Sequence, residues 1–237
     1  MSTERAGVEA VVFDLDGLLL ESEQEWSAAK RELTDKRGGT WTDAAEHEML
    51  GMSSTEWSRY MRDQLDLPLE PEEISDAVVA ILMRRYRDGL PLLPGANGAV
   101  RRIAARWPLG LASSSNREII DLVLELSGWA ELFRVTVSSE EVARGKPAPD
   151  VYVEAAKRLE ASPERCVAVE DSSAGIGSAH TAGLAVVAIP NRAYPPDPVI
   201  LDHADVVLDS LADLDQGVIE RAAAPRFGGA AAARGDV

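Results

Sequence analysis

Six short apolar runs, separated by longer segments with helical periodicity, constrain the fold of this chain more than any other feature. They lie at residues 8–13, 108–113, 135–137, 166–170, 185–188 and 205–207. Strands that alternate with helices are typical of α/β proteins with a parallel sheet. We therefore predict an α/β fold in which helices cover a mainly parallel sheet.

Three of these runs end in polar residues that a buried strand does not need. They are Asp14 and Asp16 after the first run, Ser113 to Ser115 at the end of the second, and Glu170 and Asp171 at the end of the fourth. In open α/β sheets, ligands bind outside the carboxyl ends of the strands. We expect the three polar clusters to meet in one shared site.

The interval between the first and second runs is too long for an ordinary connection from a strand to a helix. Its periodicity predicts helices over residues 22–37, 43–50, 53–66 and 71–89. We expect residues 22–92 to form an inserted helical subdomain, and residues 1–21 and 93–220 to form the α/β core. The tail at residues 221–237 is rich in small residues and is expected to be disordered.

The chain has a net charge of −16, with 40 acidic and 24 basic residues. Such a surface repels phosphate backbones and anionic lipids, so we expect neither nucleic-acid nor membrane partners. No segment is long and apolar enough for a signal peptide or a membrane span. We expect a cytoplasmic protein, a monomer or small homo-oligomer, which binds any small anion through a local positive site.

Asp14 and Asp16 share one side of the first strand because strand side chains alternate in direction. Gly17 permits the sharp turn that a backbone approaching a ligand needs. A simple turn would explain Asp16 and Gly17, but not a carboxylate directly after four apolar residues. A calcium-binding loop is excluded because the further oxygen ligands at fixed spacing are missing.

Glu170 and Asp171 would bring up to four carboxylates into the same cleft as Asp14 and Asp16. Two like charges about 4 Å apart repel by roughly 4 kcal/mol at an effective dielectric constant near 20, so the site needs a cation. Oxygen ligands without clustered histidine or cysteine favour Mg²⁺. A role for Asp171 as a helix cap would not account for the neighbouring Glu170.

A phosphate-binding site is predicted from Ser113, Ser114 and Lys146. Hydroxyls and free backbone N–H groups at a helix N-terminus bind anions, and three consecutive serines exceed what helix capping requires. Lys146 lies in a loop stiffened by Pro147 and Pro149, and it offers a compact positive charge for phosphate oxygens.

In this order, the segments resemble the motifs of the haloacid dehalogenase superfamily of phosphotransferases. The matches are D-x-D-G-x-L-x-x-S-E at Asp14 to Glu23, the serine strand end at Ser113, G-K-P-x-P-D around Lys146, and E-D-S-x-x-G-I at Glu170 to Ile176. The resemblance spans about residues 9–190. It implies a Rossmann-like three-layer core with a helical cap, as in the subfamily of sugar-phosphate phosphatases and β-phosphoglucomutase.

The resemblance implies a chemical role for four residues. Asp14 resembles the nucleophile that is transiently phosphorylated, and Asp16 resembles the general acid/base that protonates the leaving group and then activates water. Ser113 and Lys146 resemble the groups that hold the transferring phosphoryl group. A covalent aspartyl-phosphate divides a difficult displacement into two easier steps.

The resemblance also implies the remaining contacts to phosphate and metal. Leu15 and Ser114 are expected beside the phosphoryl group. Asp14, the backbone carbonyl of Asp16 and the carboxylate of Asp171 resemble Mg²⁺ ligands, with Glu170 in support of them.

Departures from the subfamily motifs leave several alternatives. A β-phosphoglucomutase-type mutase has a cap histidine where this chain has Trp26, and a cap arginine where it has Ser54, which weakens that interpretation. The dehalogenases lack a second aspartate, so Asp16 argues against them. Phosphonate hydrolases use a cap lysine, but Lys30 and Lys36 are expected near the outer end of a helix. A non-catalytic phosphometabolite-binding protein is the remaining alternative.

We therefore expect a Mg²⁺-dependent phosphatase of a small phosphorylated metabolite. The S-E-x-x-W segment resembles bacterial hexose-phosphate phosphatases of the 2-deoxyglucose 6-phosphate type, so a sugar phosphate is the expected substrate. The cap residues expected to face it are Glu23, Trp26, Met52 and Ser53.

Overall fold

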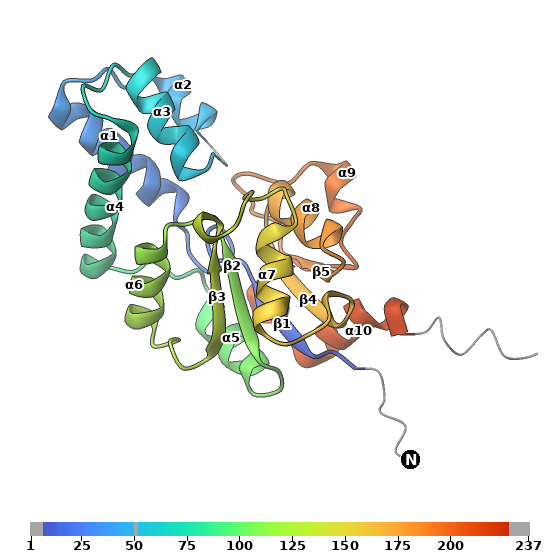
Figure 1. Cartoon of the computed structure of the whole chain (residues 1–237). Helices are drawn as coiled ribbons and strands as arrows, with labels where there is room; N and C mark the ends of the chain where they lie inside the picture. Colours follow the sequence, from blue (N-terminus) through green and yellow to red (C-terminus); the bar gives the residue numbers. More distant parts are fainter. Residues whose placement is uncertain (1–6, 50–51, 228–237) are drawn as a thin grey trace, which may run out of the picture.

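The computed structural model describes residues 7–49 and 52–227. Its centre is one six-stranded parallel sheet with the strand order β3-β2-β1-β4-β5-β6 (Figure 1). The strands are β1 Ala10–Phe13, β2 Leu109–Ser113, β3 Phe133–Ser138, β4 Cys166–Glu170, β5 Ala185–Ala188 and β6 Val206–Val207. The predicted α/β parallel sheet is confirmed, and each of the six apolar runs contains or overlaps one strand.

Side chains of the central strands alternate between two separate apolar cores. In β1, Val11 and Phe13 belong to one core, while Ala10 and Val12 belong to the other. Helices α5 Ala96–Ala104, α6 Arg117–Ser127 and α10 Gln216–Phe227 contribute to the first core, whereas α7 Asp150–Arg158 and α8 Ser173–Thr181 contribute to the second. The sheet is therefore the middle of three layers, which explains why the four inner strands β2, β1, β4 and β5 are buried along their whole length.

The segment between β1 and α5 contains four helices, α1 Glu23–Arg37, α2 Asp43–Glu48, α3 Ser54–Gln64 and α4 Pro71–Asp88. The observed bounds lie within two residues of the predicted helices; Leu50, the predicted end of the second helix, lies outside the described residues. The four helices gather beyond the carboxyl ends of the strands, away from the three layers (Figure 1).

This helical segment leaves and rejoins the core at one place. The amide of Glu21 donates to the carbonyl of Pro91 at 2.9 Å, and the amide of Leu93 donates to the carbonyl of Leu19 at 3.0 Å. The two connecting chains therefore run side by side as a short antiparallel pair.

The remaining elements are short. They are the helix α9 Pro198–Leu201 and the 3₁₀ turns Ser139–Glu141, Pro163–Arg165 and Leu211–Asp213. No helix in the described part of the chain is long and apolar enough to cross a membrane.

The C-terminal prediction is wrong for residues 221–227. These residues belong to α10, whose Ala222 and Ala223 are buried against the sheet. Small side chains let this helix pack closely, so a composition typical of disorder also suits a tightly packed helix. Residues 228–237 lie outside the described part of the chain.

The strand order explains why distant polar segments meet. β1 pairs with β2 on one side and with β4 on the other, so the three strands with polar carboxyl ends are neighbours. All three are parallel, and their carboxyl ends lie at the same edge of the sheet. The predicted convergence of Asp14, Ser113 and Glu170 at this edge follows directly.

Candidate active site

A buried lysine links two of the strand ends. Lys146 Nζ donates to Asp14 Oδ1 at 2.5 Å and to Glu170 Oε1 at 2.6 Å, and all three side chains are almost fully buried. Burial alone would lower the pKa of Lys146, but the two carboxylates hold it above its ordinary value. This lysine is therefore a fixed positive charge beside Asp14.

Glu170 is positioned by several donors in addition to Lys146. Its Oε1 accepts from the hydroxyl of Tyr152 at 2.6 Å, and its Oε2 accepts from the amide of Asp171 at 3.0 Å. Burial, followed by the charge of Glu170, raises the pKa of Tyr152 well above its usual range, so the phenol keeps its proton and donates. Glu170 is fully buried, and both of its carboxylate oxygens accept hydrogen bonds, which suits a residue that orients Lys146.

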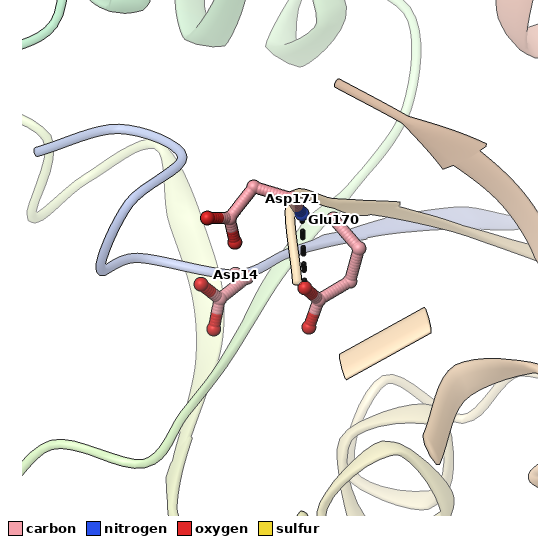
Figure 2. A group of neighbouring side chains, drawn as sticks. All are labelled: Asp14, Glu170 and Asp171. Atoms are coloured by element: carbon pink, nitrogen blue, oxygen red, sulfur yellow. Dashed lines mark hydrogen bonds between the residues drawn. The ribbon is translucent and has the colours of Figure 1, made fainter. Parts of the chain in front are cut away.

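Asp14, Glu170 and Asp171 form a compact carboxylate group. One oxygen from each lies within 4.8 Å of the others, and Figure 2 shows the side chains together at the ends of β1 and β4. Asp171 Oδ1 is buried and has no hydrogen-bond partner among the described residues. An unpartnered buried carboxylate oxygen is costly without a ligand, and this donor set matches the oxygen preference of a hard divalent cation.

The pKa values of this group indicate the same need for a cation. Burial raises the pKa of Asp14 to about 8, with the charges of Glu170 and Asp16 adding to the effect and Lys146 opposing it. The pKa of Asp171 is also raised well above its usual range, first by burial and then by Asp14 and Glu170. A bound divalent cation would offset this repulsion and keep both carboxylates ionised.

Two glycines allow the backbone to approach these carboxylates. Gly17 has φ +81°, and a Cβ there would lie 2.2 Å from Asp171 Oδ2. A Cβ at Gly175, in the first turn of α8, would lie 1.8 Å from Glu170 Oε1. No side chain fits at either position, so the loop after β1 and the start of α8 both depend on glycine.

Asp16 lies apart from the carboxylate group and is held by hydroxyls. Its Oδ2 accepts from Ser115 Oγ at 2.7 Å and from Ser113 Oγ at 3.2 Å, and its Oδ1 lies 3.4 Å from Trp26 Nε1. Its carboxylate therefore stands between the end of β2 and helix α1. The predicted metal contact through the Asp16 carbonyl stays a prediction.

A cavity of about 210 Å³ separates this edge of the sheet from the four-helix segment. Asp14, Asp16, Lys146 and Asp171 line its floor, together with Ser114 and Ser115. Glu23, Trp26, Lys30, Met52 and Trp57 line its roof. The two groups of residues thus face each other across a space large enough for a small molecule.

Four predicted site residues do not line this cavity. Leu15 is buried in the apolar core, and Glu170 and Ser113 lie beneath the floor. Ser53 instead caps α3, where its side chain and amide contact Glu56. The Leu15 side chain is therefore unavailable to a ligand, while the predicted phosphate contacts of Leu15 and Ser113 and the predicted substrate contact of Ser53 stay predictions.

The roof contains two residues that the sequence analysis missed, Lys30 and Trp57. Lys30 was expected near the outer end of its helix, and this is wrong: it is buried and lines the cavity, while Lys36 is exposed. Its spacing of four residues from Trp26 places both on one face of α1, which is the signal that could have identified it.

Ser54, which stands where the mutase motif has an arginine, does not line the cavity. Its hydroxyl donates to Asn116 Oδ1 at 3.0 Å and joins α3 to the start of α6.

Comparison with known proteins agrees with this geometry. The family model for haloacid dehalogenase-like hydrolases matches residues 8–183. Hexitol phosphatase B of Escherichia coli strain K12 is 32% identical over 220 residues, which are 90% of this chain and 97% of that protein. The bifunctional riboflavin kinase/FMN phosphatase of Arabidopsis thaliana is 32% identical over 206 residues; the match covers 86% of this chain but only 54% of that longer protein.

A solved structure agrees over nearly the whole chain. CbbY from Rhodobacter sphaeroides, determined in complex with phosphate, superposes with a TM-score of 0.81 and 29% identity, covering 90% of this chain and 99% of CbbY. The motifs, the sheet order and the family match lead to one conclusion. The chain belongs to the haloacid dehalogenase-like hydrolase family, as its resemblance to that superfamily implied.

Proposed function

We propose that this haloacid dehalogenase-like phosphatase hydrolyses the phosphate monoester of a small sugar or polyol, with Mg²⁺ as its cofactor and Asp14 as its nucleophile. One observation carries the proposal. Asp14 lies within 2.5 Å of the buried Lys146, and both line the same cavity as Asp16. A nucleophile, a fixed cation and a proton-transfer group thus surround one space.

The first step would transfer the phosphoryl group to the protein. An Asp14 carboxylate oxygen attacks phosphorus, the bond between phosphorus and the ester oxygen breaks, and that oxygen leaves with a proton from Asp16. In the second step Asp16 takes a proton from water, whose oxygen attacks phosphorus and releases Asp14 and inorganic phosphate. Bound at Asp14 and Asp171, Mg²⁺ would supply charge neutralisation for the phosphoryl oxygens.

The environment of Asp16 supports its proposed role. Ser113 and Ser115 both donate to Oδ2, which leaves Oδ1 directed toward Trp26 at the cavity roof. The leaving group occupies the roof side once phosphate lies against the floor. Asp16 thus lies between the two halves of the substrate, where a proton must be delivered.

The cavity also supports a small substrate. Its volume of about 210 Å³ is at or below the lower end of typical ligand pockets. One relative of this chain is named for action on hexitol phosphates. A sugar or polyol monophosphate agrees with both the size and this relative.

Two other reactions of this family can be distinguished from the proposed phosphatase reaction by their products and substrates. A mutase would transfer phosphate within a sugar instead of releasing it, and this chain has Trp26 and Ser54 where the mutase motifs have histidine and arginine. A phosphonate hydrolase is favoured by one observation, the presence of Lys30 in the cavity. That reaction requires a carbonyl substrate and an amine that forms an imine, so it predicts turnover of a phosphonate aldehyde.

Phosphate release from a panel of monophosphates, with and without chelator, tests the proposed function. Asp14→Asn should lose at least about 1,000-fold in kcat because the nucleophile is removed. Asp88→Asn, at an exposed aspartate at the end of α4, is the matched control and should keep wild-type activity. Full activity of Asp14→Asn, or undiminished activity in chelator, would contradict the proposal.

A further inference from the structure

Lys30 is a buried cation that has no hydrogen-bond acceptor among the described residues. Its relative exposure is 8%, yet no acceptor among residues 7–49 and 52–227 forms a hydrogen bond or ion pair with its ammonium group. Its side chain lines the roof of the cavity opposite Asp14 and Lys146. A largely buried ammonium that lines the cavity loses most of its hydration, so the position favours a polar group of the ligand as its partner.

Two tryptophans hold this ammonium group in place. Lys30 Nζ lies 5.8 Å from the ring centroid of Trp26 and 5.1 Å from that of Trp57. The rings themselves are 6.1 Å apart and inclined at 56°. Both rings also line the cavity, where their faces offer contact area to C–H groups.

An acceptor lies on the same side of the cavity. Glu23, at the start of α1, lines the roof with Lys30. Burial raises the pKa of Glu23, and Lys30 opposes that rise; burial likewise lowers the pKa of Lys30 to about 8, against the charge of Glu23. Both side chains line the same cavity, and in the described part of the chain they form no hydrogen bond with each other, so they present an acceptor and a donor to a ligand.

The charges that line the cavity disfavour a second phosphate group of the ligand as the partner of Lys30. Four carboxylates line it (Asp14, Asp16, Glu23 and Asp171), against the two lysines Lys30 and Lys146. A divalent cation on the floor would balance this difference, leaving no spare positive charge on the roof. A dianionic group placed beside Lys30 would also lie beside Glu23, whose charge repels it.

We propose that Glu23 and Lys30 bind two adjacent hydroxyl groups on the uncharged part of the substrate, with the Trp26 and Trp57 rings against its carbon chain. One hydroxyl donates to Glu23 and the other accepts from Lys30. This inference rests on the proposed function and narrows it: the substrate is a monophosphorylated polyol or sugar with a vicinal diol. Lys30 and Glu23 are then the residues that distinguish it from an alkyl phosphate.

The test compares two monophosphates of equal length, a hexitol 6-phosphate and hexyl phosphate, which lacks hydroxyls. The measured quantity is the ratio of their kcat/KM values. In Lys30→Met and in Glu23→Met this ratio should fall by about 10- to 100-fold, because a charged group that binds a hydroxyl rejects the analogue without it. The double variant should lose little more than either single variant, because both residues hold one diol.

Lys36→Met, at an exposed lysine on the same helix, is the matched control and should keep the wild-type ratio. An unchanged ratio in Lys30→Met, or a wild-type protein that prefers hexyl phosphate, would overturn the diol assignment while leaving the phosphatase intact. A wild-type preference for a hexitol bisphosphate that Lys30→Met abolishes would overturn it in favour of an anion site. Release of phosphate from none of these esters, with Mg²⁺ present, would instead contradict the proposed function itself.

Discussion

Two buried lysines face one cavity from opposite sides, and both lie over aromatic rings, but only one of them has carboxylate partners. Lys146, on the floor, contacts two carboxylates at 2.5 and 2.6 Å. Lys30, on the roof, lies against two aromatic rings and has no hydrogen-bonded partner in the described chain. The pKa of Lys146 is held above its ordinary value, whereas burial lowers that of Lys30 to about 8.

The difference separates the two halves of the site by chemistry. A lysine already neutralised by carboxylates is preorganised, and it contributes electrostatic stabilisation without rearrangement when charge develops. A lysine without a partner is incomplete until a ligand arrives, and it gains most from a ligand that supplies an acceptor. We therefore assign the floor to the reaction and the roof to recognition.

Replacement of Lys146 should have the largest effect on this comparison. Lys146→Met leaves Asp14 and Glu170 buried without their cation, so the free energy of unfolding should fall by about 3 to 5 kcal/mol. Activity should fall at least about 100-fold because a charge-stabilising group is lost. Urea unfolding and phosphate release measure the two effects. Lys157→Met, at an exposed lysine of α7, should change neither stability nor activity. A stability loss below about 1 kcal/mol in Lys146→Met would contradict the proposed difference between the two lysines.

Magnesium should act on the floor alone. At 100 times its Kd, a ligand that binds only the folded state adds about 2.7 kcal/mol, which corresponds to a rise in Tm of about 5 to 10 °C for a chain of this size. Asp171→Asn should abolish this rise because an anionic ligand is replaced by a neutral amide, while Glu23→Gln on the roof should keep it. Thermal unfolding with and without Mg²⁺ measures the shift, and an equal rise in Asp171→Asn would contradict the assignment.

Removal of Lys30 should raise stability instead of lowering it. Burial disfavours the charged form, so Lys30→Met should increase the free energy of unfolding at pH 7 by about 1 to 2 kcal/mol after loss of the cation–π contacts. The folded state releases this proton near pH 8 and the unfolded state near pH 10.4, so wild-type stability rises with pH between these values. The advantage of the variant should therefore shrink as pH increases from 8 to 10.

Other titratable groups lie around Lys30, and the stability experiment must separate their effect from that of Lys30. Glu23 on the same helix, Glu46 from α2 and Tyr194 from the core line a small space with Lys30. Burial raises the pKa values of Glu23 and Tyr194, and wild type and Lys30→Met both retain these groups, so the difference between the two stability curves reports on Lys30. Lys36→Met, which changes an exposed lysine, should show no such pH dependence. Parallel stability curves for wild type and Lys30→Met between pH 7 and 10 would show that the roof lysine is not destabilised by burial.

The smallest effect is expected where the roof meets the core. Ser54→Ala removes the hydrogen bond from Ser54 Oγ to Asn116 Oδ1 and should cost about 1 kcal/mol in the free energy of unfolding. KM should rise more than kcat falls, because this contact holds the roof near the floor without touching the reacting atoms. Thr55→Ala, at the exposed neighbouring position, is the control; equal effects in both variants would mean that the contact does not matter.

The sheet and its polar edge were predictable from the sequence, because the strands β1, β2 and β4 are continuous apolar runs and a polar cluster lies at the end of each. Asp14, Ser113 and Glu170 could be placed together from the strand pattern alone. The roof was harder to predict. The spacing from Trp26 places Lys30 on the same face of α1, but whether that face meets solvent or substrate depends on how α1 packs against α4 and the core. The prediction for residues 221–227 was wrong for a related reason. A segment rich in alanine, such as the one around Ala222 and Ala223, is compatible with disorder and also with a closely packed helix.

The side-by-side crossing of the chain near Leu19 and Leu93 has an evolutionary consequence. Because the helical segment enters and leaves the core through two hydrogen-bonded connecting segments, we expect that its length and contents can change without altering strand order or moving Asp14 relative to Lys146. In this view the α/β core carries out the reaction, and the helical segment that forms the roof selects the substrate. New specificities can arise by rebuilding residues between 22 and 92 while the chemistry is inherited unchanged.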